Sequence, residues 1–304
     1  MVSSRNAFVD LTNRAIKKVL FDTYVLQPEM YPEIFNVMSV DSGKNYIESE
    51  VSTLGVIPVK AENADIVYQD PAQLYDQTYT FRTYAGGWKA SEEMVEDDLF
   101  GIMGKKMAAQ LGKSLKYTIE QDAANVYNRA TNDTYAGGDA VGLCSAAHPI
   151  EGGTEQNELS TAADLSVTSL RQAIQDMEET VDYKGKLGAL KPTNLLAPPE
   201  EYWNAMELLK SAQDPASANN KINPLKNYLE LMVNPYLTDA DACFLLDKTA
   251  ADGHLATQFI WRVKPDIQLP SMNDFDSGEL KYKVRARWAT GWTAWRGIYL
   301  IQGV

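Results

Sequence analysis

The feature of this 304-residue chain that most constrains its fold is an extended stretch leading into one long helix, over residues 45 to 131. Residues 41 to 90 are rich in β-branched and aromatic side chains, which favours strands and ordered loop over disorder. From Ser91 to Val126 an apolar residue recurs every three to five positions, which predicts an amphipathic helix of about forty residues and roughly 60 Å. An extended arm followed by a rod is typical of a protein that contacts its neighbours.

The predicted helix begins at Ser91, a good N-cap, with acidic residues in its first turn. Each glycine inside it costs about 1 kcal/mol relative to alanine. A break at Gly101 and Gly104, leaving a short helix before the main rod, is therefore one expectation, and an uninterrupted rod is the other. The apolar stripe consists of Val95, Leu99, Ile102, Met107, Leu111, Leu115, Ile119, Ala123 and Val126.

The composition is that of a globular protein, with 45% hydrophobic and 23% charged residues, enough for one large domain or two smaller ones. The longest apolar runs, such as residues 298–301, are too short to cross a bilayer. The N-terminus lacks the apolar core of a signal peptide. We therefore expect a protein made in the cytosol, without a membrane partner. The two cysteines, in apolar contexts, predict buried thiols, and two histidines leave little basis for a zinc site.

The net charge of −13 is opposite in sign to that of most sequence-specific nucleic-acid binders. It is compatible with a container for nucleic acid, because a vessel that must release its contents should not hold phosphates tightly.

The remaining segments predict a mixed α+β protein. Near the N-terminus a short amphipathic helix, residues 11–20, ends before two prolines. Residues 86–88 are expected to form a turn. Further strands are predicted at residues 56–59, 66–68, 79–83, 190–197, 228–233, 243–246, from 260 and at 280–288, and further helices at residues 170–177 and 200–212.

Few residues suggest chemistry. Ser145, His148 and Asp139 could form a hydrolase triad, but no Gly-x-Ser-x-Gly signals a strained nucleophile turn, so a structural turn is preferred. His254 is assigned to a turn for the same reason. The glycine pairs lack a phosphate-binding context, and the acidic pairs on helices point apart. The loop 273–276 lacks the later glutamate of a calcium-binding loop. No catalytic, cofactor-binding or metal-binding residue is predicted.

The strand at residues 280–288 carries an unusual charge pattern. Apolar residues alternate strictly with four cations, which repel one another unless an anionic partner lies near. A solvated sheet edge is the simplest explanation. The alternatives are the acidic arm of a neighbouring copy, which we prefer, and packaged nucleic acid. The candidate inter-subunit contacts are the cations Lys281, Lys283, Arg285 and Arg287 and the arm acids Glu48, Glu50, Glu62, Asp65, Asp70 and Asp76.

The order of these parts resembles the major capsid protein of tailed bacteriophages, whose shared fold is named after phage HK97. The phrases that carry the resemblance are Gly142-Leu-Cys-Ser-Ala-Ala-His-Pro149, Leu195-Leu-Ala-Pro-Pro-Glu-Glu-Tyr202 and the closing segment from Leu280 to Gly303. No single phrase is highly specific, but the series covers nearly the whole chain in order.

The resemblance implies a fold and a function. The fold is an α+β, HK97-like capsid fold. Its parts are an N-arm (1–44), an extended E-loop (45–90), a peripheral domain with a long spine helix (91–159), an axial α/β domain (160–263) and the return strands of the peripheral domain (264–304). The function implied is a structural, non-enzymatic subunit that forms pentamers and hexamers of an icosahedral shell around double-stranded DNA. The implied partners are itself, a portal, a scaffold or protease, and in some members decoration proteins. The location implied is the virion, after assembly in the host cytoplasm.

Two features depart from parts of that family. No long helical scaffold segment precedes the arm, so the segment is absent or the scaffold is a separate protein. The closing strand carries cations where a cross-linking site would need a carboxylate, so no covalent cross-linking is expected. The closest alternative is an encapsulin-like nanocompartment of the same fold with an enzyme cargo. A soluble α/β hydrolase using Ser145 and His148 is the alternative of a different class.

Overall fold

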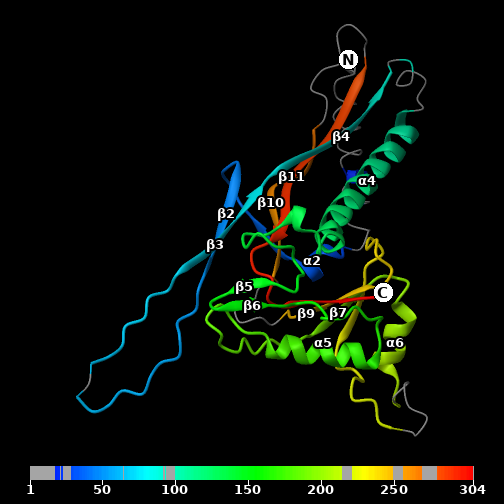
Figure 1. The fold of residues 1–304 in the computed structure, drawn as a ribbon. Helices are drawn as coiled ribbons and strands as arrows, with labels where there is room; N and C mark the ends of the chain where they lie inside the picture. Colours follow the sequence, from blue (N-terminus) through cyan, green and yellow to red (C-terminus); the bar gives the residue numbers. More distant parts are fainter. Residues whose placement is uncertain are drawn as a thin grey trace.

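The computed structural model describes residues 18–20, 22, 29–63, 65–91, 93, 100–213, 221–248, 256–268 and 279–303. Figure 1 shows two connected parts and a projecting arm. One part contains long strands with the helix α4 alongside. The other contains short strands with the helices α5 and α6. The architecture is α+β, as predicted.

The first part is built on a four-stranded sheet, called here the long sheet. Its order is β1 (Asn36–Ser39), β10 (Thr257–Gln268), β11 (Leu280–Trp292) and β4 (Arg82–Ala90). β1 is parallel to β10, and the other pairs are antiparallel. The alternation predicted along β11 is confirmed.

The side chains of β11 divide between the two faces of the long sheet. Tyr282, Val284, Ala286 and Trp288 are buried, whereas Lys281 and Lys283 are exposed and Arg285 and Arg287 are half-buried on the opposite face. The predicted turn at residues 86–88 is wrong, because these residues lie inside β4. A Cβ atom at Gly87 would lie 2.5 Å from the carbonyl oxygen of Tyr282, so the glycine allows β4 and β11 to approach closely.

The helix α4 (Phe100–Asn128) packs along the long sheet. Its stripe residues Leu115, Ile119, Ala123 and Val126 share one core with Trp288 and other residues of the sheet. The helix runs through Gly101 and Gly104 without a break. Between its predicted start at Ser91 and Phe100, residues 92 and 94–99 lie outside the described residues. Met107 was assigned to the buried stripe wrongly, since it is 42% exposed.

Residues near the N-terminus are fastened to α4 by specific contacts. A Cβ at Gly112 would lie 3.0 Å from the carbonyl oxygen of Leu20, so this glycine leaves room for the passing chain. The buried Glu120 accepts the N–H groups of Met30 (3.0 Å) and Tyr31 (3.1 Å) at the start of α2 (Tyr31–Ile34). Because Glu120 satisfies two orphan donors at a helix N-terminus, it fixes where the chain enters the core.

The second part is built on the short sheet, with the order β12 (Ile298–Gln302), β9 (Ala242–Leu246), β7 (Asn194–Ala197) and β8 (Glu230–Val233). One face of this sheet joins the core of α4, and the other face packs with α5 (Val167–Glu179) and α6 (Tyr202–Lys210). The range 264–304 therefore does not lie in one sheet. β11 belongs to the long sheet and β12 to the short one, and residue 264 falls within β10.

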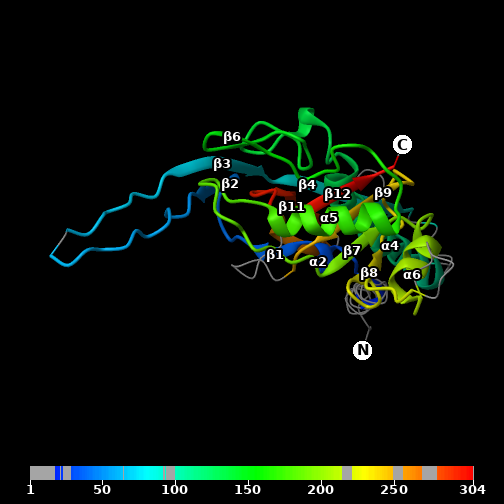
Figure 2. The same cartoon turned by 60° about the horizontal axis from the view of Figure 1, so that its bottom comes forward.

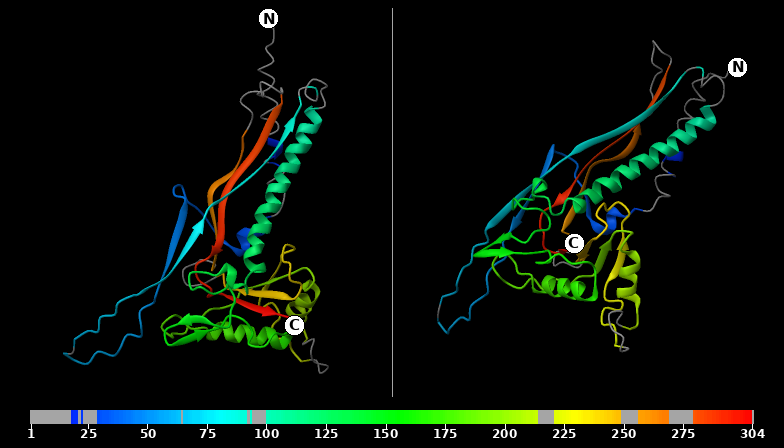
Figure 3. Two further views of the ribbon diagram at one scale, coloured as in Figure 1. Left: turned by 45° about the horizontal axis from the view of Figure 1, so that its top comes forward. Right: turned by 45° about the vertical axis from the view of Figure 1, so that its right-hand side comes forward.

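The arm consists of β2 (Asn45–Val51), β3 (Gln73–Thr80) and the arm loop between them, residues 52–72. Among the described strands, β2 and β3 pair only with each other. The loop extends away from the rest of the molecule in every view (Figures 1, 2 and 3). The predicted strands at 56–59 and 66–68 are wrong: these residues are extended but hydrogen-bond to no strand within the described chain. The remaining short elements are η1 (Asp133–Tyr135), β5 (His148–Ile150) and β6 (Gly153–Glu155).

Candidate functional site

The hydrolase alternative fails on the surroundings of His148. Its Nδ1 does lie 2.7 Å from Asp139 Oδ2, as in a triad. However, its Nε2 faces Asn157 Oδ1 at 3.1 Å, and Ser145 Oγ instead accepts the N–H of Ala147. His148 is also fully buried. Because no serine faces Nε2 and the ring is buried, His148 cannot act as the general base that activates a nucleophile.

The hydrogen bonds around His148 hold its ring in a fixed orientation. Asn157 Oδ1 accepts the N–H of Ser145, and Asn157 Nδ2 donates to the carbonyl oxygen of Leu143, so the orientation of this amide is fixed. The ring of His148 is therefore fixed between the oxygens of Asp139 and Asn157.

This buried network continues to the root of the arm. Trp295 stacks on the His148 ring at 4.3 Å, and the Arg296 guanidinium lies 4.6 Å from the Trp295 ring. Arg296 then pairs with Glu50 of β2 at 2.8 Å and donates from Nε to the carbonyl oxygen of Val181. Burial raises the pKa of the Glu50 carboxyl, and the charge of Arg296 offsets part of that rise. The network sets the direction in which the arm leaves the body.

We expect Arg296→Ala to lower the free energy of unfolding by about 1.5–3 kcal/mol, since it removes charge-assisted hydrogen bonds and leaves Glu50 without its counter-ion. The loss should be largest at neutral pH and should shrink as the pH falls through the raised pKa of Glu50, because a protonated carboxyl needs no counter-ion. Urea unfolding at several pH values measures it. Arg82→Ala, which removes an exposed arginine without an ion pair in the described chain, should stay within about 0.5 kcal/mol. Equal losses in both variants would contradict this role of Arg296.

The arm loop exposes apolar side chains to an unusual degree. Large aliphatic and aromatic residues on a folded surface normally occur singly, whereas a contiguous group marks an interaction site. The group on this loop comprises Leu54 (48% exposed), Val56 (77%), Ile57 (85%), Val59 (100%), Ile66 (57%), Val67 (67%) and Tyr68 (85%). Within the described chain these side chains remain exposed, so the arm loop presents a contiguous apolar surface.

The six arm acids predicted as contacts separate into two groups. Glu48 and Glu50 lie in β2 and are engaged within the subunit, by Thr293 Oγ1 (2.5 Å) and Arg296 respectively. Asp76 in β3 is exposed and accepts a hydrogen bond from Gln73. The remaining three, Glu62, Asp65 and Asp70, are exposed on the arm loop.

The cationic face of β11 lies opposite the face that packs on α4. Lys89 of β4 is paired with Lys281 in the sheet register and therefore extends this face. Part of the charge is neutralised within the subunit, because Glu279 lies 2.7 Å from Lys89 and 3.9 Å from Lys281, and Asp266 stands opposite Arg285. The structure thus brings the four predicted cations together on one face, whereas the three loop acids form no ion pair with a described residue.

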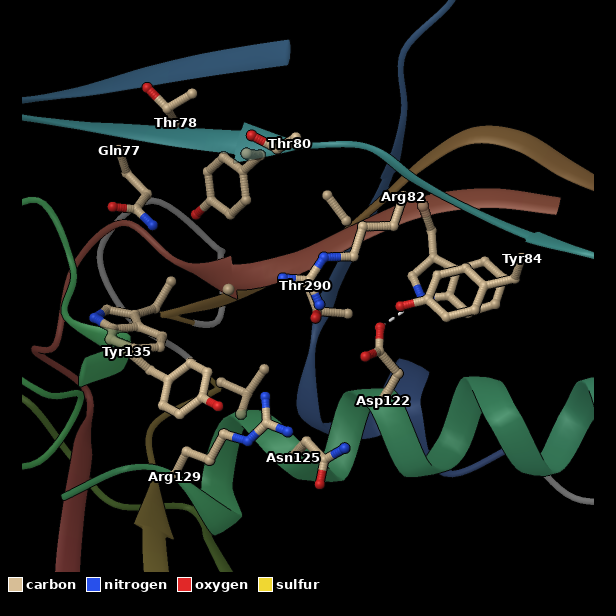
Figure 4. A pocket seen from close by; sticks show the side chains of 16 residues that line it. Gln77, Thr78, Thr80, Arg82, Tyr84, Asp122, Asn125, Arg129, Tyr135 and Thr290 are labelled. Atoms are coloured by element: carbon tan, nitrogen blue, oxygen red, sulfur yellow. Dashed lines mark hydrogen bonds between the residues drawn. The ribbon is translucent and has the colours of Figure 1, made fainter. Parts of the chain in front are cut away.

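A pocket of about 260 Å³ lies at the base of the arm, between β3, β4, β11 and α4 (Figure 4). Its floor includes Trp288, which stacks on Tyr84 at 3.8 Å and donates from Nε1 to Asp122 Oδ2 at 2.7 Å. Burial and the adjacent Asp122 raise the pKa of Tyr84 to about 12. Arg129 is held over the Tyr135 ring at 4.3 Å. The pocket has no arrangement of acid, base and nucleophile.

No helix of the described residues has the length and hydropathy needed to cross a membrane. The same part of the chain contains no group of three or more histidine, cysteine or carboxylate side chains placed to hold a metal ion.

Comparison with known proteins agrees with a role in assembly. Residues 75–301 match the sequence model of the family described as phage capsid protein. The chain belongs to the phage capsid protein family. No curated protein sequence matches it significantly.

Solved capsid structures share the fold of this phage capsid protein at very low sequence identity. The capsid protein of cyanophage P-SCSP1u aligns with a TM-score of 0.58 at 10% identity, over 91% of this chain and 89% of that one. The capsid of a native GTA particle aligns with a TM-score of 0.55 at 13% identity, over 92% and 96%. The virus-like particle from Pyrococcus furiosus aligns with a TM-score of 0.55 at 9% identity, over 95% and 98%. The fold is thus HK97-like. Membership of the phage capsid protein family makes the chain a structural subunit of a virion capsid shell.

Sequence reasoning missed the network that fixes the arm of this capsid protein. Glu50 and Arg296 are distant in the sequence and carry no motif, so only the pairing of β2 with β3 and the position of Trp295 bring them together. Lys89 was also missed as part of the cationic face. Only the register between β4 and β11 places Lys89 beside Lys281. That register could not be read from the sequence, because residues 86–88 were assigned to a turn.

Proposed function

We propose that the arm of each subunit lies over the cationic face of β11 in a neighbouring subunit, and that this contact joins subunits into pentamers and hexamers of an icosahedral shell. The observation that carries the proposal is the exposed apolar arm loop, whose side chains are not covered by any described part of their own chain. A closed shell makes many such contacts at once, so each contact need only be weak.

Charge complementarity supports the choice of the β11 face. The loop acids Glu62, Asp65 and Asp70 outnumber its single cation, Lys60, whereas Lys283 is exposed without an ion pair to a described residue. In addition, Tyr79 of the arm packs against Ile260 and Ala289. Because Ala289 alternates in phase with Lys283 and Arg287, the arm leaves from the face of the sheet that carries the cations.

The proposal assigns a role to each segment. Residues 1–44 form the N-arm, 45–90 the E-loop, 91–159 the peripheral domain with its spine helix and 160–263 the axial domain at the capsomer centre. Within 264–304, β11 returns to the peripheral domain and β12 joins the short sheet of the axial domain. The shell encloses double-stranded DNA and is assembled in the host cytoplasm with a portal and a scaffold or protease, and in some relatives with decoration proteins. The protein is not an enzyme.

An encapsulin-like container is the second candidate. The likeness to the virus-like particle from Pyrococcus furiosus concerns the fold alone, because the identity is 9%. The match to the phage capsid protein family favours the viral role. The contents of purified particles separate the two: nuclease-protected DNA supports the capsid, and a single enriched enzyme without DNA supports the nanocompartment.

A charge-reversal experiment tests the arm contact. Lys281→Glu with Lys283→Glu should raise the protein concentration needed for shell formation by about tenfold, because two exposed attractions of about 0.2–1 kcal/mol each become repulsions. Light scattering and negative-stain microscopy measure it. Adding Glu62→Lys, Asp65→Lys and Asp70→Lys in the same chain should partly restore assembly.

The matched control is Lys221→Glu with Lys226→Glu, which changes the charge equally at exposed positions of the other part of the molecule. It should assemble like the unmodified protein. If the combined reversal restores nothing, or if the control fails equally, the arm does not dock on the β11 face.

A further inference from the structure

The exposed face of α4 is a second cationic surface in this acidic protein. From Phe100 to Ile119 the helix contains four lysines and no acidic residue, although the chain as a whole has a net charge of −13. Lys116 is buried and pairs with Glu29 at 2.6 Å. Lys105, Lys106 and Lys113 are exposed and make no ion pair within the described chain. We call these three residues the lysine face.

The two acids of α4 are placed so that they do not neutralise the lysine face. Glu120 is 2% exposed and accepts the backbone N–H groups of Met30 and Tyr31. Asp122 accepts the indole N–H of Trp288 on the side of the helix that meets the sheet. Lys106 and Lys113 are seven positions apart, so they project from the same side of the helix. Gln110 and Tyr117 fall on the same stripe and are exposed.

The lysine face and the arm lie on opposite sides of the long sheet. α4 packs on the sheet face that presents Val284 and Trp288. The arm packs through Tyr79 and Phe81 on the other face, which presents Ile260 and Ala289. In a shell one subunit thick, the arms of neighbouring copies therefore cover one surface of the layer, and the lysine face belongs to the other. The acidic arm cannot be its counter-charge.

We propose that the lysine face of α4 binds the phosphate backbone of the packaged DNA, an inference that rests on the proposed capsid function. The three lysines span about 12 Å along the helix, and duplex DNA carries about seven phosphate charges over that length. Lysine contacts phosphate as a point charge without sequence preference. Three weak contacts per subunit, repeated over the lumen, hold DNA of any sequence while leaving it releasable.

The experiment measures the salt dependence of DNA binding by the unassembled full-length protein, on which both faces are accessible. The probe is a 30-base-pair duplex of random sequence, at several salt concentrations from low to physiological. Because binding releases counter-ions, the logarithm of the binding constant falls with the logarithm of the salt concentration, with a slope of about −0.9 per neutralised phosphate. Lys105→Gln, Lys106→Gln and Lys113→Gln together should therefore make the slope less steep by about 2.7 and weaken binding at low salt.

The matched control is Lys191→Gln, Lys221→Gln and Lys226→Gln, which removes the same charge from exposed positions outside α4. The inference is supported if only the α4 variant loses slope. It is overturned if the slope is unchanged, or if the two variants lose slope equally. Because the substituted lysines are exposed, both variants should melt like the unmodified protein.

Shell formation by the same variants keeps this inference separate from the proposed function. Both variants should still form shells, and shells of the α4 variant should protect less DNA from nuclease. Failure of the unmodified protein to form shells would refute the proposed function while leaving the slope measurement valid. Shells of the α4 variant with a full complement of protected DNA would refute the inference alone. Loss of shells with an unchanged slope would identify the lysine face as a protein contact and also refute it.

Discussion

Replacing Trp288 by alanine is expected to lower the free energy of unfolding by about 3–5 kcal/mol, the range for removing a large aromatic side chain from a core. Trp288 is fully buried. It stacks on Tyr84 at 3.8 Å, lies beside Trp261 at 5.6 Å and donates to Asp122 at 2.7 Å. Its loss opens a cavity between the long sheet and α4 and removes the indole N–H donor from the Asp122 carboxylate.

Trp203→Ala is the matched control, because it removes the same side chain from α6, where Trp203 is 74% exposed. Its cost should stay within about 0.5 kcal/mol. Urea unfolding of the unassembled protein, followed by far-UV circular dichroism, measures both. A loss below about 1 kcal/mol for Trp288→Ala would mean that α4 and the long sheet do not depend on this contact.

The parts of the fold that the sequence predicts well are those whose pattern is set within a single element. The strict alternation from residue 280 onward determines which side of β11 is buried, and the apolar stripe from Leu115 to Val126 determines which side of α4 meets the sheet. In both, the side-chain period of the element alone identifies the buried side.

The errors concern elements whose state depends on a partner. Residues 56–59 have strand-forming side chains but pair with no strand of the described chain, so propensity alone did not make a sheet there. Gly87 resembles a turn residue, yet its role is to let two strands approach. β12 closes the chain in the short sheet because its partner β9 lies there, a long-range pairing that no local pattern encodes.

The candidate contact residues were predicted as a class rather than as a site. The sequence identified an acidic arm and a cationic strand, but Glu48 and Glu50 proved to be used in anchoring the arm to its own subunit. Likewise, His148 and Asp139 do pair as the triad alternative required, although the second ring nitrogen meets Asn157 and not a serine. The sequence suggested that His148 and Asp139 pair, but only the tertiary structure shows that the pair is structural and not catalytic.

The largest effect on assembly is expected from removing the apolar surface of the arm loop. Val56→Ser, Ile57→Ser and Val59→Ser together should raise the concentration needed for shell formation at least about 100-fold. Burial of one such side chain contributes about 1.5–3 kcal/mol. Successive residues of an extended chain face opposite ways, so we expect about two of the three to be covered in the contact. A loss of about 3 kcal/mol per subunit corresponds to more than a hundredfold in concentration.

The same substitutions should leave the subunit itself unchanged, because the three side chains are between 77% and 100% exposed and contribute nothing to its core. Unfolding of the unassembled variant should therefore match that of the unmodified protein within about 0.5 kcal/mol. The variant with Val56→Ile, Ile57→Val and Val59→Ile keeps the apolar area and should assemble normally. Static light scattering against protein concentration distinguishes these outcomes. If the serine variant forms shells at the same protein concentration as the unmodified protein, the apolar side chains of the arm loop are not buried in the subunit contact. That result would contradict the proposed role of the arm loop.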